Sequence, residues 1–457
     1  MLDAMKPYRI GAGAGYAGDR IDPAQALAER GGLDALVFEC LAERSIALAQ
    51  LQRSRDPQLG YDPLLAARLR AVLPACVRHG TTIISNMGAA NPQAAGAAVL
   101  AVARELGLKR LRVAVVSGDD VLPWLRGNDA ALIDSVPSDS GGTCQRACDL
   151  GERLISANAY MGADALLPAL ASGADVIITG RVADPALFLA PLMHHFGWRT
   201  DDWPLLGQGV LVGHLLECAA QVSGGYLADP GRLDVPDLHD VGFPLAEVQA
   251  NGSAVITKLA GTGGRVDRLS CTAQLLYEIE DPASYLQPDV VADFSQVRLF
   301  EQGPNRVQVS GARGCARPDS LKATLGYRDG WIGEGQISYA GPGAVARGRL
   351  ALQVLEHRLK MLGLGALERR AELIGLDAMH GPRLGVDRTP YEVRTRLAVR
   401  CATQDQAQVV GREVEALYLN GPAGGGGVTQ TVREVIAVAS ALVPREAVQP
   451  GLQILEL

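Results

Sequence analysis

The sequence predicts an α/β protein with an N-terminal, mainly parallel sheet flanked by helices and a C-terminal α+β domain. In the first half, short apolar runs rich in β-branched residues alternate with helix-like segments, which is typical of a parallel sheet with crossover helices. After residue 230 the pattern changes to strands joined by hairpins. Because 457 residues, 48% of them hydrophobic, can build more than one core, we expect domains at residues 1–230 and 231–457.

Local signals justify the elements of the first half in order. Asp22-Pro23 and Asn91-Pro92 each place a capping residue before a proline, which indicates a helix start. The apolar runs between the helices are interpreted as strands. We expect strands at residues 8–11, 34–39, 81–85, 111–116 and 174–179, and helices at residues 22–30, from residue 43 and from residue 91.

The second half favours a mixture of strands and helices without an internal repeat of 20 to 50 residues. The expected strands lie at residues 254–259, 297–301, 306–309 and 321–327, and the expected helices at residues 344–362 and 406–418. A further helix-like run at residues 428–441 follows a glycine-rich loop.

Charged and amide side chains collect directly after the predicted parallel strands. Glu39 ends the second strand, Asn86 follows the third, and Arg181 and Asp184 follow the strand at residues 174–179. Because the carboxyl ends of parallel strands meet at one edge of a sheet, we expect a polar pocket there in preference to unrelated solvated loops. Glu39 and Asp184 are candidate catalytic carboxylates, and the candidate substrate-binding residues are Arg181, Asn86, Arg44 and Asp19. Arg181 is the expected clamp for a substrate carboxylate, since a guanidinium binds that group with two hydrogen bonds.

A predicted helix at residues 213–226 carries His214, Glu217 and Gln221 on one face, among Leu, Cys and Ala. A carboxylate with so apolar a neighbourhood is a candidate for proton transfer, because partial burial brings its pKa closer to neutral. Glu217 is therefore a third candidate catalytic residue. A structural helix with a polar stripe explains the same pattern.

The loop at residues 420–427 contains four consecutive glycines ahead of the helix-like run at 428–441. Glycine amides without a Cβ, next to a helix N-terminus, can bind a carboxylate, a phosphate or a developing oxyanion. Asn420, Gly424, Gly425 and Gly426 are the candidate binding residues of this loop, and a flexible turn is the alternative.

A dinucleotide-binding motif is matched only loosely. Residues 13–18 read G-x-G-x-x-G, and Glu39 follows at the expected distance. The helix, however, begins at Asp22-Pro23 and not within the glycines, and Asp19 would place a negative charge beside a pyrophosphate. We therefore expect no nicotinamide or flavin cofactor.

Composition disfavours several other classes. The eight cysteines form no C-x-x-C pair, and no histidine lies near Cys144 and Cys148, so we expect no metal site. A net charge of −7, without a basic stripe, argues against nucleic acid as a partner. The apolar runs are too short for membrane spans and the N-terminus has no signal-peptide core, so we expect a cytoplasmic protein.

The order of several motifs resembles the acyclic terpene utilisation AtuA family over nearly the whole chain. The motifs lie at residues 11–19, 39–44, 85–88, 179–185, 217–221, 225–226, 275–278, 338–342 and 420–427. The resemblance implies a place in the catabolism of branched acyclic terpenoid acids as coenzyme A esters. It also implies a small ferredoxin-like domain beyond residues 444–445, which for this chain we expect to be either missing or supplied by a separately encoded subunit.

These observations together favour an enzyme that needs no cofactor, a hydratase or dehydratase acting on a small carboxylate or acyl-CoA thioester. Such a reaction needs an acid–base pair and donors for an enolate oxygen, and the candidate carboxylates, arginines and glycine amides include both. A hydrolase with a carboxylate-activated water and a non-catalytic ligand-binding or scaffold subunit are the alternatives. A homo-oligomer is expected.

Overall fold

The computed structural model describes residues 6–137, 142–382 and 389–457. The chain forms two compact units, one of residues 1–326 together with 438–457 and one of residues 327–437. Among the helices that the structure describes, none has the length and apolar character needed to cross a bilayer.

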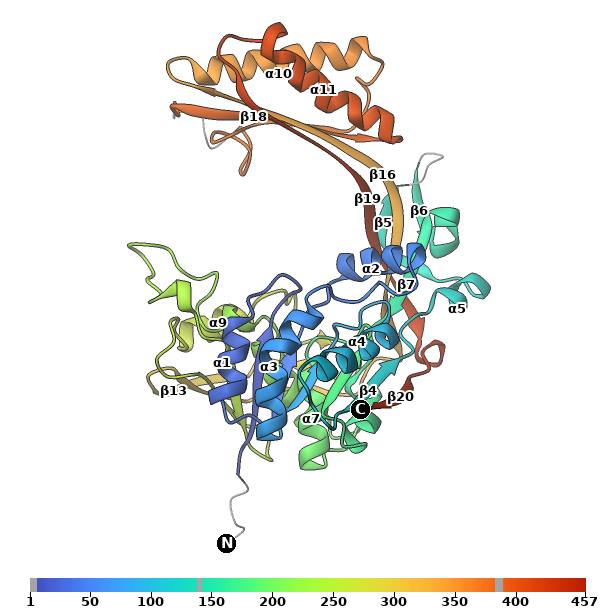
Figure 1. Ribbon diagram of the computed structural model, residues 1–457, viewed down its shortest axis with the longest axis vertical. Coiled ribbons are helices and arrows are strands. Elements are labelled where there is room, and N and C mark those ends of the chain that lie inside the picture. Colours follow the sequence, from blue (N-terminus) through green and yellow to red (C-terminus); the bar gives the residue numbers. More distant parts are fainter. Residues whose placement is uncertain (1–5, 138–141, 383–388) are drawn as a thin grey trace. The chain divides into compact units, whose positions relative to one another are not determined.

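The first unit is built around a ten-stranded mixed sheet, which confirms a mixed α/β fold (Figure 1). Its centre is parallel and contains, in spatial order, β1 (Tyr8–Ala14), β2 (Ala35–Phe38), β3 (Thr82–Ser85), β8 (Val176–Thr179) and β4 (Arg112–Ser117). Antiparallel strands extend it, on one side β9 (Pro244–Val248), β10 (Ala254–Lys258), β14 (Arg306–Ser310) and β13 (Arg298–Gly303), and on the other β20 (Gly451–Glu456). Five strands that follow residue 230 thus belong to the first sheet, so the division between the units differs from the boundary predicted between residues 230 and 231.

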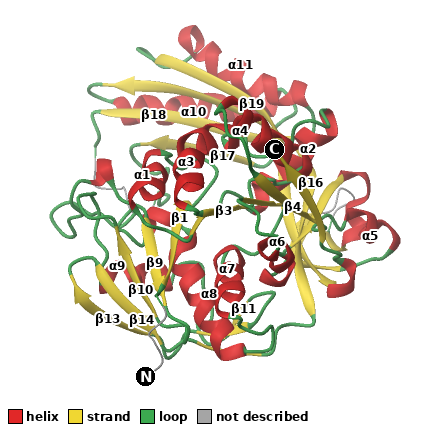
Figure 2. Ribbon diagram, turned by 60° about the horizontal axis from the view of Figure 1, so that its bottom comes forward, coloured by secondary structure: helices red, strands yellow, loops and turns green. Residues whose placement is uncertain are grey.

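Helices cover both faces of this sheet (Figure 2). One face carries α1 (Asp22–Arg30), α3 (Leu65–His79) and α4 (Pro92–Glu105), and the other carries α7 (Ala186–Phe196) and α8 (Trp203–Glu217). Helix α4 begins as predicted, because the Asn91 side chain accepts a hydrogen bond from the Ala94 amide and Pro92 follows it. Helix α8 is apolar on all sides and buried from Gly209 to Glu217, so its few polar side chains lie in the protein interior.

The first unit is completed by shorter elements. Its other helices are α2 (Glu43–Arg55), α5 (Leu122–Gly127), α6 (Leu167–Ala171) and α9 (Arg268–Leu275). Its other strands are β5 (Ala131–Pro137), β6 (Thr143–Arg146), β7 (Leu154–Ala159) and a three-stranded sheet of β11 (Tyr285–Leu286), β12 (Val291–Asp293) and β15 (Arg313–Cys315).

The second unit has the element order βαββαβ. It consists of β16 (Ser320–Ala340) from residue 327 onward, α10 (Ala344–Met361), β17 (Arg369–Ile374), β18 (Glu392–Cys401), α11 (Gln404–Asn420) and β19 (Gly426–Pro444) up to residue 437. The remaining residues of β16 and β19 belong to the first unit, and the sheet order is β17-β18-β16-β19. This is the ferredoxin-like arrangement. The alternating burial along β18 and the buried positions of α10, one helical turn apart, form its core. A ferredoxin-like unit is therefore part of this chain, and a separately encoded small subunit of that fold stays a prediction.

The helix expected at residues 428–441 is wrong, because this segment is the strand β19. Strands β16 and β19 are neighbours in the sheet and run side by side in Figure 1. The segment is rich in valine, threonine and isoleucine, whose branched side chains favour strands. The glycine loop consequently has no helix N-terminus after it, so the helix contribution to the predicted anion site is absent at residues 428–441.

Arginines hold the glycine loop through its carbonyl groups. Arg347 Nη1 donates to the carbonyl of Ala423 at 2.9 Å, and Arg394 Nη1 donates to the carbonyl of Gly427 at 3.0 Å. The Val428 amide donates to the Tyr418 hydroxyl. These contacts give the loop a structural role within the second unit.

Alanine at position 425 is expected to lower the free energy of unfolding by about 1–3 kcal/mol, because the added carbon overpacks the core. A Cβ on Gly425 would lie 2.8 Å from Cδ1 of Ile337 and 3.1 Å from the Tyr339 ring. A Cβ on Gly426 would meet no atom within 4 Å, so Gly426→Ala is the matched control. Urea unfolding of the two variants measures the difference, and equal midpoints would contradict this packing.

Candidate functional site

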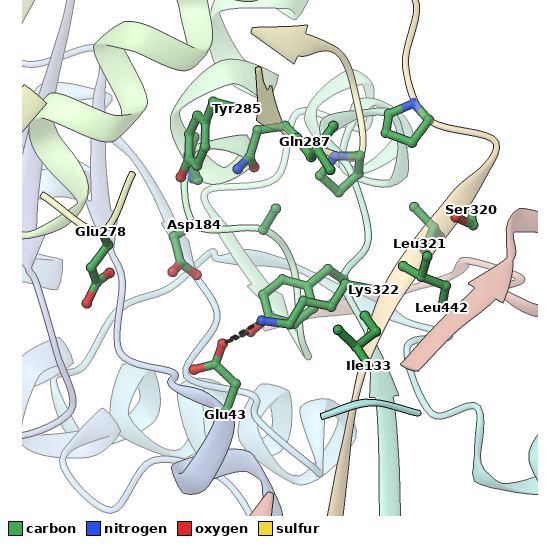
Figure 3. Close-up of a pocket in the computed structure, with 16 residues that line it drawn as sticks. Glu43, Ile133, Asp184, Glu278, Tyr285, Gln287, Ser320, Leu321, Lys322 and Leu442 are labelled. Atoms are coloured by element: carbon green, nitrogen blue, oxygen red, sulfur yellow. Dashed lines mark hydrogen bonds and ion pairs between the residues drawn. The ribbon is translucent and has the colours of Figure 1, made fainter. Parts of the chain in front are cut away.

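The first unit contains a cavity of about 400 Å³ that has a polar and an apolar part (Figure 3). Its polar lining consists of Glu43, Tyr160, Asp184, Glu278, Tyr285, Gln287, Ser320 and Lys322. Its apolar lining consists of Ile133, Ala183, Pro185, Leu286, Pro288, Pro318, Leu321 and Leu442. In Figure 3 the carboxylates lie at one end and Ile133, Leu321 and Leu442 at the other. This division suits a small molecule with a hydrocarbon part and a reactive polar group.

Asp184 occupies the connection between β8 and α7, and its side chain, 37% exposed, lines the cavity. Partial burial raises the pKa of Asp184 to about 7. The ion pair with Arg181 lowers this pKa, whereas the negative charges of Glu217 and Glu43 raise it. The carboxyl group therefore changes its protonation near neutral pH, as a general acid or base requires.

Arg181 is buried, with 1% of its side chain exposed, and the protein engages each of its three side-chain nitrogens. Nε and Nη2 donate to the carbonyl of Val182, Nη1 donates to the carbonyl of Leu41, and Nη2 also pairs with Asp184. The guanidinium carbon lies 4.5 Å from the centroid of the Tyr160 ring. The predicted clamp for a substrate carboxylate does not fit this geometry, because the guanidinium does not line the cavity. Arg181 instead positions Asp184.

Asp119 supports the same segment from the end of β4. Its Oδ2 accepts hydrogen bonds from the Arg181 amide at 3.0 Å and from Asn158 Nδ2 at 2.8 Å. Burial raises the pKa of Asp119 to about 6, although these hydrogen bonds lower it. A Cβ at position 180 would overlap the Asp119 carboxylate, which explains the glycine before Arg181.

Glu39 and Asn86 meet at the carboxyl ends of β2 and β3, and this convergence confirms the predicted edge of the sheet. Asn86 Nδ2 and the Leu41 amide both donate to Glu39 Oε1, at 2.9 and 2.8 Å. Burial raises the pKa of Glu39 well above its usual range, and the negative charge of Asp184 raises it further. Neither side chain lines the cavity, so Glu39 and Asn86 do not touch a molecule bound there.

Helix α8 places His214 and Glu217 on one buried face, as predicted, with His214 Nδ1 2.8 Å from Glu217 Oε1. Their other polar atoms, His214 Nε2 and Glu217 Oε2, are buried and have no hydrogen-bond partner in the part of the chain that the structure describes. The His214 ring packs edge-on against Tyr285, with centroids 5.5 Å apart. The predicted continuation of this face to Gln221 is wrong, because α8 ends at Glu217. The pair of His214 and Glu217 therefore lies directly behind Tyr285, which is part of the cavity wall.

Glu43 is held by two side chains at the start of α2. Its Oε1 accepts hydrogen bonds from the Tyr160 hydroxyl at 2.6 Å and from Lys322 Nζ at 3.2 Å. Burial raises the pKa of Glu43, but these two contacts, helped by the positive charge of Arg181, outweigh it and hold the pKa at about 2. Asp184 and Glu43 thus line one cavity and differ in their ionisation behaviour, a pattern seen in acid–base catalysis.

Comparison with known protein families places the chain in one of them. The model of the acyclic terpene utilisation family protein AtuA matches residues 8–454. The chain belongs to this family. A search of curated proteins found no match.

The glycine motif of this AtuA family member has a packing role. A Cβ on Gly15 would lie 2.5 Å from the carbonyl carbon of Cys218, and one on Gly13 would lie 2.7 Å from the Phe38 ring. The Gly15 amide donates to Asp19 Oδ2 at 2.8 Å, so the Asp19 carboxylate stabilises the loop of residues 15–19. Gly15 therefore permits close approach of the end of α8, and Gly13 permits close packing of Phe38.

Other predicted residues do not reach the cavity. Asp19 is used within its loop, and Arg44 is exposed and does not line the cavity. Asn420, Gly424, Gly425 and Gly426 belong to the second unit, whereas the cavity belongs to the first. Across the described ranges, no three His, Cys, Asp or Glu side chains are grouped so that they could hold a metal ion.

Most residues of the cavity wall were not predicted from the sequence. Tyr160 follows β7, Tyr285 lies on β11 and Lys322 lies on β16, so none of them follows a strand of the parallel sheet. Glu278 occurs in the motif at residues 275–278 that supported the family resemblance, and this was the available signal for it. Its backbone has a positive φ of 58°, which is unusual for a residue other than glycine and is common near functional sites.

Proposed function

We propose that this AtuA family member is an enzyme that adds water to, or removes water from, a branched acyl compound. The observation that supports this proposal best is the Asp184 carboxyl group, with a pKa of about 7, in the wall of a half-apolar cavity. The apolar lining matches a branched hydrocarbon chain of the kind that the family name indicates.

In the dehydration direction, ionised Asp184 removes a proton from the carbon next to the carbonyl group, and hydroxide leaves from the following carbon as water after protonation. The Tyr285 hydroxyl is a suitable donor at this step. Burial raises the pKa of Tyr285, and the charges of Glu217 and Asp184 raise it further, so the phenol keeps its proton at neutral pH. In Figure 3 this hydroxyl points towards Asp184. Hydration uses the same groups in reverse.

A panel of branched hydroxyacyl and enoyl compounds, each as the free acid and as a thioester, tests the proposal. Formation or loss of the conjugated double bond, followed by absorbance and mass spectrometry, is the expected result. Release of free thiol without a change in the double bond would instead identify a hydrolase. No reaction of any compound, with or without a co-purified partner, would favour a non-catalytic binding subunit.

Glu217→Gln is expected to shift the pH dependence of kcat/KM to lower pH. The negative charge of Glu217 raises the pKa of Asp184, so its removal lowers that pKa below about 7. The hydrogen bond with His214 survives through the amide oxygen, and turnover should fall by about 10²-fold if the glutamate itself moves a proton. The pH–rate profile separates the two effects. An unchanged profile with normal turnover would remove Glu217 from the mechanism.

A further inference from the structure

The charges around the cavity restrict what can bind in it. Within the described residues, its wall contains the carboxyl groups of Glu43, Asp184 and Glu278 and one amino group, that of Lys322. Figure 3 shows all four pointing into the same space. Acidic groups therefore outnumber basic ones in this wall.

Lys322 and Arg181 are already engaged with carboxylates of the cavity wall. Lys322 Nζ lies 3.2 Å from Glu43 Oε1 and 5.3 Å from the centroid of the Tyr160 ring. Arg181 is buried and pairs with Asp184. A carboxylate brought into the cavity would meet like charges, and it would have to displace Glu43 from Lys322 to gain an ion pair.

Uncharged donors, in contrast, are available. Tyr285, Gln287 and Ser320 line the same wall, and Figure 3 places the Gln287 amide beside Tyr285. No hydrogen bond from the Tyr285 hydroxyl or the Gln287 side chain to another described residue is present in the structure. A carbonyl oxygen can accept hydrogen bonds from such groups without bringing a charge.

We infer that the cavity binds the acyl group in an uncharged form, as an ester, thioester or amide, and excludes the free carboxylate. This inference rests on the proposed function and narrows its substrate class. It departs from the expectation that Arg181 would clamp a substrate carboxylate.

Calorimetric titration with unreactive ligands tests the inference. The ligands are 3-methylbutanoate and its methyl ester, primary amide and N-acetylcysteamine thioester, which have no double bond or hydroxyl group to react. At least one uncharged form should bind about ten-fold more tightly than the carboxylate, or better. The three uncharged forms together show which acyl derivative is preferred. Equal or tighter binding of the carboxylate, or no binding of any uncharged form, would overturn the inference.

A variant that removes one negative charge from the cavity wall tests whether charge repulsion excludes the carboxylate. Glu278→Gln removes one lining carboxylate and should tighten binding of 3-methylbutanoate about three-fold while leaving the amide unchanged. Glu280→Gln is the matched control, since Glu280 is exposed on the same segment and does not line the cavity. Equal effects of both variants on the carboxylate would contradict the charge explanation. Tight binding of uncharged ligands without turnover in the panel would refute the proposed reaction and leave this inference standing.

Discussion

Asp184→Asn is expected to lower kcat by about 10²-fold or more while the protein stays folded. Asparagine keeps the size of the side chain and an oxygen that can accept from Arg181, but it cannot take up or release a proton. In the wild type, the pH dependence of kcat/KM should show an ionisation near pH 7, where Asp184 titrates. That ionisation should disappear from the profile of the variant.

Steady-state kinetics between pH 5 and pH 9 on the substrate found in the panel measures both effects. Asp201→Asn is a suitable control, because Asp201 is an exposed aspartate that pairs with an arginine, as Asp184 does, outside the cavity. A folded Asp184 variant that retains more than half of the wild-type activity would show that another group transfers the proton.

Arg181→Met is expected to lower the free energy of unfolding by about 1–3 kcal/mol, because buried carbonyl oxygens lose the donor that satisfies them. The variant leaves the carbonyls of Leu41 and Val182 without their donor and Asp184 without its cation. Arg181→Lys should recover part of the lost unfolding free energy, because a lysine ammonium keeps the positive charge. It should not recover all of it, because the ammonium lacks the planar set of donors with which the guanidinium binds Leu41, Val182 and Asp184.

Urea unfolding measures these differences, and Arg44→Met is the control. Arg44 is exposed, so its replacement should change the unfolding free energy by no more than about 0.5 kcal/mol. If Arg181→Met unfolds at the same urea concentration as the wild type, Arg181 does not stabilise this segment. Loss of the cation should also raise the pKa of Asp184, so the pH dependence of kcat/KM should shift to higher pH. This kinetic effect is measured separately from stability.

The parallel centre of the fold could be predicted because its signals are local. Prolines after Asp22 and Asn91 mark α1 and α4, and apolar runs mark the strands. From the strands alone it followed that Glu39 and Asn86 would meet, since adjacent parallel strands end at one edge. The spacing of His214 and Glu217 likewise placed them on one buried helix face.

The remainder depends on contacts between distant parts of the chain. Tyr160 and Lys322 both bind Glu43, from which they are separated by 117 and 279 positions in the sequence, and no local pattern predicts such contacts. The role of Arg181 could not be inferred either, because a guanidinium that binds substrate and one that binds its own backbone have the same sequence context. For β19 the local signal was misread, since a run of branched residues after glycines suits a strand.

The contact between Gly15 and Cys218 connects the first loop of the chain to the ionisation of Asp184. Cys218 follows Glu217 directly, and a Cβ at position 15 could fit only if the end of α8 moved away. Such a movement would carry the Glu217 carboxylate with it and change the charge that Asp184 experiences. Natural variation at residue 15 could therefore tune the working pH of the site without altering any group in the cavity wall.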